Sequence, residues 1–264
     1  VTTGSENVGI GDNALSQVAT TNGNTAVGSN AGASVVGASN TAIGQYALQA
    51  ATTTNDNTAV GASALTANTG GASTTGIGSG ALSANTTGAS NTAVGAGSLN
   101  DNTTGANNVA LGRNTLSLNV TTSSNTAIGH EALKANTASN NTAVGNAALV
   151  ANTTGASNTA MGHSALAAST TGTENVAVGM YALDASGAGT DGSYNVAVGN
   201  DALGANTEGQ FNVGIGRRAL YANTVADENT AVGYSCLQAN TTGAGNVAMG
   251  ISAMNANTTG QYNV

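Results

Sequence analysis

The side chains that could carry out nucleophilic, acid–base or metal chemistry are few in this sequence, and they lie apart. His130 and His163 each follow a glycine of a short sequence repeat that is described below. No acidic residue or cysteine occupies the equivalent position of a neighbouring repeat, as a zinc site would require. Cys236 is the single cysteine, so there is no intrachain disulfide, and no neighbouring base activates its thiol. These residues predict neither a metal site nor a catalytic nucleophile.

The carboxylates are scattered over unrelated positions, as Asp12, Asp56, Asp101 and Asp184 illustrate. A glycosidase needs two carboxylates that face each other across the scissile bond, and no repeat supplies such a pair. The periodic aspartate of glycine-rich calcium-binding repeats is also missing. We therefore predict no catalytic residue and no bound cofactor, and we expect that the protein is not an enzyme.

Aromatic rings are concentrated late in the chain, where two of them occupy equivalent positions in adjacent repeats. Tyr194 and Phe211 each stand directly before the asparagine that opens a repeat, so we expect their rings to stack. Such a pair is a candidate ligand surface for a sugar, but aromatic ladders also serve packing, which is the interpretation that we favour.

The element that must position these residues is a short repeat that runs from end to end. A glycine that follows a small residue and an aliphatic residue recurs at spacings of 17 residues, with two spacings of 16 and one of 20. So short a period is typical of a solenoid, because one unit cannot bury its apolar face alone. We predict one repetitive segment over residues 1–264, with the long spacing absorbed by a loop extension within residues 184–195.

The slots of the repeat predict its cross-section. Asparagine in the first slot is followed by threonine or valine in the second, alanine or glycine in the third, an aliphatic residue in the fourth and glycine in the fifth. In most repeats a leucine stands four residues after this glycine. We expect two short strands and two bends per coil, and hence an all-β parallel β-solenoid (β-roll) of about fifteen 17-residue coils. The aliphatic and leucine slots are predicted to face inward, and the threonine or valine of the second slot is predicted to lie on the same inward face. The predicted core residues of the aliphatic and leucine slots include Val94, Leu99, Leu111, Leu116, Ile128 and Leu133.

The third slot holds only alanine or glycine, as at Ala93, Ala110 and Ala127. Alternation along a strand would turn this slot away from the predicted interior, and its strict smallness then favours close contact with another backbone. We predict a seam between subunits there; a tight turn or a second layer within one chain is the alternative. A coil with so little apolar surface also favours an oligomer, either a homotrimer or an end-to-end homopolymer.

The strings "NTAVG", "NVAVG" and "NVALG", followed by "xxAL" or a near variant, resemble the head repeats of trimeric autotransporter adhesins. Similar repeats with "NTTG" turns occur in phage and virus tail-fibre proteins. The resemblance covers the whole chain and implies a left-handed parallel β-roll, three chains around one axis, and an extracellular fibre on a cell surface or a virion. The extra turn residues of this sequence depart from the adhesin repeat, and no coiled-coil stalk, membrane anchor or chaperone domain is recognisable in it. Both the bacterial adhesin and the phage tail fibre therefore stay open. Because the chain begins inside a repeat and stops where another opens, we expect a segment of a longer fibre or a stacking subunit.

Charge and composition exclude other classes of partner. The net charge is −8 with four cationic side chains, which argues against nucleic acid and anionic membranes, and no apolar run is long enough to span a bilayer. We predict a structural or adhesive fibre segment that presents or forms a host-attachment surface, with a cell-surface receptor or glycan as partner. The alternatives are a self-stacking extracellular filament subunit and an ice-binding β-solenoid. The last would need outward Thr-x-Thr, whereas we expect the strand threonines to face inward.

Overall fold

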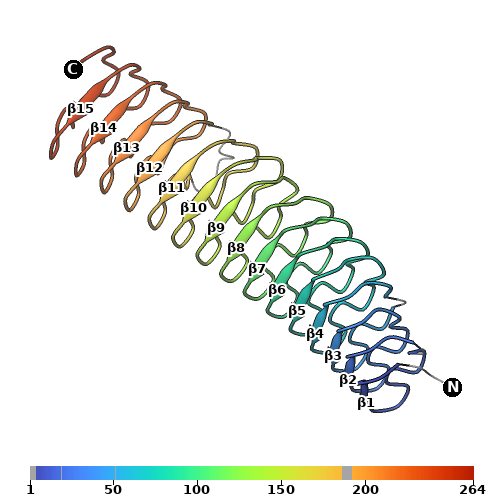
Figure 1. The fold of residues 1–264 in the computed structure, drawn as a ribbon. Coiled ribbons are helices and arrows are strands. Elements are labelled where there is room, and N and C mark those ends of the chain that lie inside the picture. Colours follow the sequence, from blue (N-terminus) through green and yellow to red (C-terminus); the bar gives the residue numbers. More distant parts are fainter. Residues whose placement is uncertain (1–3, 19, 51, 186–191) are drawn as a thin grey trace. The chain divides into compact units, whose positions relative to one another are not determined.

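The computed structural model describes residues 4–18, 20–50, 52–185 and 192–264. Its elements are fifteen strands of three residues, one per coil, and the described residues contain no helix (Figure 1). The chain is an all-β parallel β-solenoid of about 14 turns, which confirms the predicted fold class. Contacts divide it into two compact units, Val1–His130 and Glu131–Val264.

Unit 1 stacks eight strands in chain order, each parallel to the next. Equivalent slots pair throughout, so that Thr92 lies opposite Val109 and Ala93 opposite Ala110. The stack therefore repeats one cross-section at every level. Its strands are β1 (Val8–Ile10), β2 (Thr25–Val27), β3 (Thr41–Ile43), β4 (Thr58–Val60), β5 (Thr75–Ile77), β6 (Thr92–Val94), β7 (Val109–Leu111) and β8 (Thr126–Ile128).

Unit 2 follows the same plan with seven strands. These are β9 (Thr142–Val144), β10 (Thr159–Met161), β11 (Val176–Val178), β12 (Val196–Val198), β13 (Val213–Ile215), β14 (Thr230–Val232) and β15 (Val247–Met249). The long spacing lies between β11 and β12, where Val176 still pairs with Val196. The extension thus leaves the register unchanged; its residues 186–191 lie outside the described part of the chain.

Each coil contains one strand, and the predicted second strand at the leucine slot is wrong. Leu99 and Leu116 lie in turns with φ of 48° and 51°, in the left-handed region that an extended strand cannot use. The backbone at this slot still joins neighbouring coils, because the Leu99 amide donates to the Thr115 carbonyl at 2.9 Å. Coils are therefore linked by hydrogen bonds at the turn as well as along the strand.

The interior is formed by the leucine slot and the alanine slot. Leu99, Leu116 and Leu133 are fully buried, as predicted. The seam predicted between subunits is wrong, because the three alanines assigned to it are also fully buried within their own chain: Ala93, Ala110 and Ala127.

Packing between coils explains why the alanine slot is always small. Where Gly76 occupies this slot, an added Cβ would lie 3.3 Å from Cγ of Leu65, in the preceding coil, and 3.2 Å from the Ala81 carbonyl oxygen. The leucine of one coil therefore fills the space in front of the third slot of the next, and only a methyl group fits.

The aliphatic slot faces the opposite way from the prediction. Val94 and Ile128 are 36% and 37% exposed, and Leu111 is only half-buried. The threonine or valine two residues earlier shares this outer face, since alternate residues of a strand point to the same side. The inward placement predicted for both slots is therefore wrong.

Buried asparagines complete the interior as two ladders. In the first, the Asn108 amide donates to Oδ1 of Asn91 at 2.9 Å. In the second, Nδ2 of Asn102 donates to Oδ1 of Asn85 at 2.8 Å and to the Gly105 carbonyl at 3.0 Å. Both ladders satisfy backbone groups that a coil of this size cannot expose to water, so asparagine is as much a core residue here as leucine.

The glycine that ends each strand turns the corner, as its recurrence suggests. Gly61 has a φ of 132°, and an added Cβ would lie 2.6 Å from the Gly78 carbonyl carbon in the next coil. A side chain is excluded twice, by the backbone conformation and by the neighbouring corner.

Candidate functional site

In each unit the outer face of the strands carries two rows of uncharged side chains. We call the fourth-slot residues of the strands the aliphatic row and the second-slot residues the threonine row. In unit 1 five of the eight side chains of the aliphatic row are exposed, from 36% at Val94 to 59% at Ile10, and Val27, Val60 and Leu111 are half-buried. The threonine row beside it is unbroken from β2 to β6 and consists of Thr25, Thr41, Thr58, Thr75 and Thr92.

Unit 2 makes the same face more apolar. Met161, Ile215 and Met249 of its aliphatic row are 44%, 39% and 77% exposed. Valine replaces threonine in β11, β12, β13 and β15, so that both rows are largely aliphatic there. No strand position of either row carries a charge, in any of the fifteen strands. Repeated exposure of uncharged side chains on a regular surface is typical of an interaction face.

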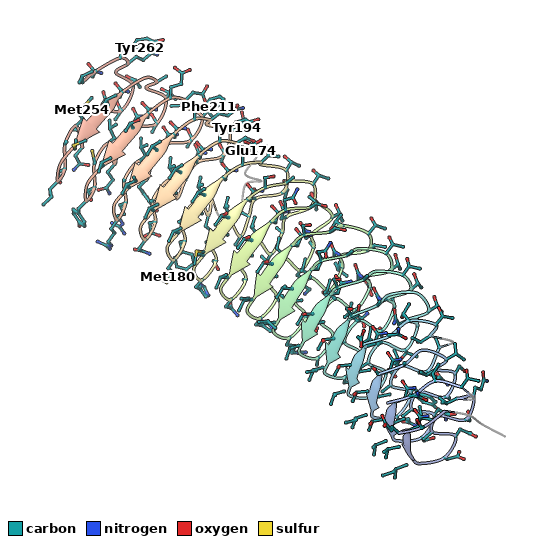
Figure 2. The ribbon with its side chains drawn as sticks, in the orientation of Figure 1. Glu174, Met180, Tyr194, Phe211, Met254 and Tyr262 are labelled. Atoms are coloured by element: carbon teal, nitrogen blue, oxygen red, sulfur yellow. The ribbon has the colours of Figure 1, made fainter. Side chains whose placement is uncertain are left out.

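The predicted aromatic stack is present on another side of unit 2, where Figure 2 shows both rings projecting from adjacent coils. The ring centroids of Tyr194 and Phe211 lie 5.0 Å apart with the planes inclined by only 4°. This separation is close to the ~4.8 Å rise between strands, so each ring covers a face of the other. The stack is therefore a packing contact between adjacent coils.

The isolated histidine and cysteine make structural contacts. His163 packs against Tyr181 in an edge-to-face pair, with centroids 5.4 Å apart and planes at 87°. Cys236 is buried, its Sγ lies 3.2 Å from the Ala248 carbonyl oxygen, and burial raises the pKa of its thiol above the ordinary value. A raised pKa disfavours the thiolate that a nucleophile requires.

Neither a metal cluster nor a membrane-spanning helix is present among the residues that the structure describes. Within that part of the chain, no group of three or more histidine, cysteine, aspartate or glutamate residues is placed to hold a metal ion. The same residues form no helix that could cross a membrane.

Sequence reasoning missed a cavity of about 270 Å³ in unit 2, which we call the unit-2 cavity. Its lining comes from three consecutive coils and consists of Tyr181, Asp184, Asp201, Gly204 and Tyr221. The signal was present in the sequence, because Gly204 stands in the slot after the buried leucine, where the adjacent coils carry the side chains of Asp184 and Tyr221.

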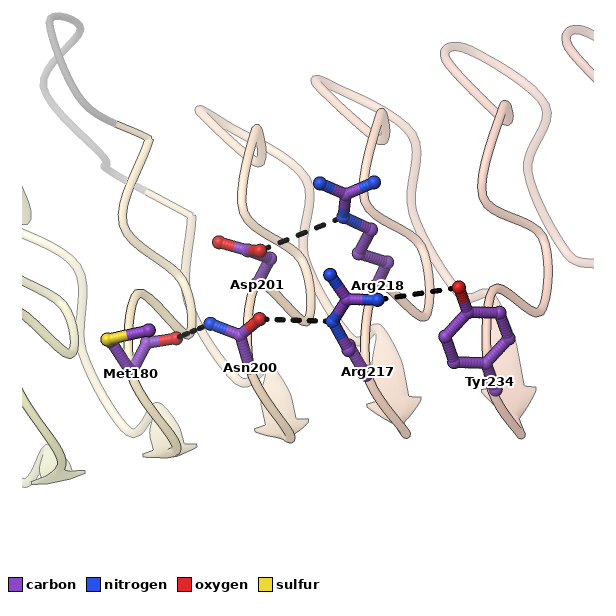
Figure 3. Close-up of polar contacts among 6 residues, drawn as sticks. All are labelled: Met180, Asn200, Asp201, Arg217, Arg218 and Tyr234. Carbon is purple, nitrogen blue, oxygen red and sulfur yellow. Dashed lines mark hydrogen bonds and ion pairs between the residues drawn. The ribbon is translucent and has the colours of Figure 1, made fainter.

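The surroundings of the cavity are polar and interconnected (Figure 3). Nε of Arg218 lies 3.8 Å from Oδ2 of Asp201, and its guanidinium carbon lies 5.5 Å from the centre of the Tyr221 ring. Desolvation raises the pKa of the Asp184 carboxyl above its ordinary value, against smaller opposing effects of the Ala168 backbone and His163.

A row of hydrogen bonds continues along the slot beside the cavity. Nδ2 of Asn200 donates to the Met180 carbonyl at 3.0 Å, and its Oδ1 accepts from Nε of Arg217 at 3.4 Å. Nη1 of Arg217 in turn lies 3.4 Å from the Tyr234 hydroxyl. These bonds cross-link four consecutive coils.

Comparison of the chain with protein-family models finds no match, and comparison with curated proteins finds none either. The case for a function therefore comes from the repeat, the outer face of the strands and the unit-2 cavity.

Proposed function

We propose that the chain is a segment of an extracellular structural or adhesive fibre, which associates with further copies of itself through the outer face of its strands. The observation that carries this proposal is the aliphatic row. The leucine and alanine slots already complete the interior of each coil, yet every strand still presents an aliphatic side chain to solvent.

A second copy of this chain fits the face for two physical reasons. Both rows are uncharged, so the face itself adds no like-charge repulsion to an association of chains whose net charge is −8. Two copies also repeat at the same rise of ~4.8 Å, so contacts made at one coil recur at the next. Covering a side chain that is a third to a half exposed contributes about 0.5–1 kcal/mol, and many coils add together.

A homotrimer is the form that the resemblance to trimeric adhesin and tail-fibre repeats supports. Three chains with their aliphatic rows turned to a common axis would leave the aromatic stack and the turns on the outside. The fibre would then stand on a cell surface or a virion and present a host-attachment surface to a receptor or glycan. End-to-end stacking into a longer filament is the alternative assembly.

Sedimentation velocity and native mass spectrometry test the association. Replacing Val198 and Ile215 with glutamate places two charges on the outer face without entering the core, and we expect a shift from oligomer to monomer. The matched control is Val225→Glu, which alters a 46% exposed aliphatic residue outside the strands and should leave the assembly intact. A wild-type monomer, or an unchanged oligomer in the double variant, would contradict the proposal.

The threonine row favours a second candidate, ice binding, because it lies on the outer face instead of the inner one. Five consecutive threonines pair in register from β2 to β6, beside an equally regular aliphatic row. An ice-binding face must stay open to water, whereas association would cover it. Thermal hysteresis and ice-crystal shaping by the wild-type chain, lost on Thr58→Lys with Thr75→Lys, would support ice binding over the fibre.

A further inference from the structure

The unit-2 cavity exists because one coil lacks a side chain that its neighbours carry. The slot after the buried leucine holds Asp184 in the coil of β11 and Tyr221 in the coil of β13, but Gly204 between them. The Tyr221 ring leans over the glycine, since Cδ2 and Cε2 lie 3.2 Å from the point where a Cβ would stand. The gap is therefore bordered by the rings of Tyr181 and Tyr221 and by the carboxylates of Asp184 and Asp201.

Two rings border this gap, and contacts outside it hold each of them. Tyr181 is packed edge to face with His163, and Tyr221 lies under the guanidinium of Arg218. Both tyrosines nevertheless remain open to solvent, at 40% and 39% exposure. The two rings are therefore fixed before any ligand arrives, which lowers the entropic cost of binding.

Two carboxylates line the cavity, and one guanidinium lies beside one of them. Asp201 is paired with Arg218 across 3.8 Å, a separation too long for a hydrogen bond, and Nε of Arg218 is buried without a hydrogen-bond partner among the described residues. Asp184, partly buried, supplies the second carboxylate. Carboxylate oxygens accept hydrogen bonds from hydroxyl groups, and aromatic rings pack against C–H surfaces.

We propose that the unit-2 cavity binds one neutral sugar ring, with Asp184 and Asp201 accepting from its hydroxyl groups and the rings of Tyr181 and Tyr221 packing against its C–H face. The inference deepens the proposed adhesive function by naming the ligand class, and it rests on that function for its biological role. The volume of about 270 Å³ suits a single ring, below the range usual for drug-sized ligands.

Charged ligands fit the site less well. An anion would face two carboxylates. A cation would compete with Arg218, whose guanidinium already holds the cation–π position over Tyr221 and neutralises Asp201. A neutral ligand with several hydroxyl groups uses the acceptors and meets neither objection.

Saturation-transfer-difference NMR on the full chain tests the inference, with the methyl glycosides of glucose, galactose and N-acetylglucosamine as probes and tetramethylammonium as a cationic comparison. We expect transfer to at least one glycoside. Gly204→Asn introduces the side chain that Asn100 carries in the same slot, at a backbone position outside the left-handed region, and should abolish the transfer. Tyr181→Ala should weaken binding roughly two- to tenfold.

The matched control is Tyr46→Ala. Tyr46 stands in the same slot as Tyr181, with φ of 60° against 58° and 38% exposure against 40%, but the next coil carries Thr66 where unit 2 has Gly204. This variant should bind like the wild type. The inference is overturned if the wild type transfers saturation to no glycoside, if only tetramethylammonium responds, or if Gly204→Asn binds unchanged.

Sedimentation of the same samples separates the two proposals. A chain that binds a glycoside but remains monomeric would refute the assembly and keep the sugar site. An oligomer that binds no glycoside would refute the sugar site and keep the assembly. Circular dichroism of Gly204→Asn and Tyr181→Ala establishes that each variant retains the wild-type fold, so that lost binding reports on the cavity.

Discussion

Replacing one asparagine of the first buried ladder with alanine should lower the unfolding free energy of unit 1 by more than a substitution at the surface does. Asn108 accepts from the Asn125 amide at 3.0 Å and donates from Nδ2 to the Thr122 carbonyl at 2.9 Å. Asn108→Ala removes both bonds, but the Thr122 carbonyl still accepts from Nδ2 of Asn119 at 3.1 Å, so the Asn125 backbone amide is the group that loses its side-chain acceptor. Loss of the acceptor of one buried amide costs about 1–3 kcal/mol, and this is the expected decrease of the unfolding free energy.

Urea unfolding followed by circular dichroism measures this loss as a lower transition midpoint. The neighbouring Asn107 provides the control, because it is exposed and its slot holds serine in both adjacent coils, at Ser90 and Ser124. Asn107→Ser should change the free energy of unfolding by less than about 0.5 kcal/mol. If Asn108→Ala is as mild as Asn107→Ser, the ladder does not stabilise the stack and the account of the interior is wrong.

Three further outcomes are expected. Thr74 interrupts the first ladder, since its hydroxyl donates to the Ala72 carbonyl at 3.1 Å; Thr74→Asn should offer Oδ1 to the Asn91 amide and raise the stability measured in urea by about 1 kcal/mol. The raised pKa of Asp184 means that its ionised form opposes folding, so the unfolding free energy falls as the pH rises through that pKa. Asp184→Asn should therefore raise the melting temperature at neutral pH. The same variant should give no gain at pH 3, which lies below the ordinary carboxyl pKa. Deleting residues 91–107 joins Ser90 to Asn108 and keeps every slot, whereas deleting 91–98 brings Leu99 into the asparagine slot; only the first variant should give the wild-type circular dichroism spectrum.

The period of the repeat was sufficient to predict a parallel β-solenoid, because each coil must place equivalent residues above one another. The facing of the strand could not be predicted in the same way. A three-residue strand offers two faces, and size alone favoured the aliphatic one as the interior. What decides the matter is the leucine of the preceding coil, which leaves room for only a methyl group, and this contact is between coils.

The leucine slot was misassigned as a strand for a related reason. Leucine is not a residue that favours left-handed φ, yet Leu99 and its equivalents adopt it because the surrounding turn and the buried side chain fix the backbone there. The stacking of Tyr194 on Phe211 was predicted correctly, since it depends only on equal slots in adjacent coils. The unit-2 cavity depends on residues from three slots, and it becomes visible only when the coils are aligned in space.

The orientation of the strand, with its alanine slot inside and its aliphatic slot outside, also explains which slots vary from one repeat to the next. Inward slots are constrained by coils above and below, so asparagine, alanine, leucine and glycine recur there with few exceptions. The slots beside the corner are free of that constraint, and in unit 2 they hold Met180, Arg217 and Tyr234 in successive coils around Asn200, where unit 1 has mostly small or polar residues. Because these large side chains are linked by hydrogen bonds across consecutive coils, the coils of β11 to β14 depart from the uniform repeat. Specific recognition is therefore expected in unit 2, and assembly along the outer face of both units.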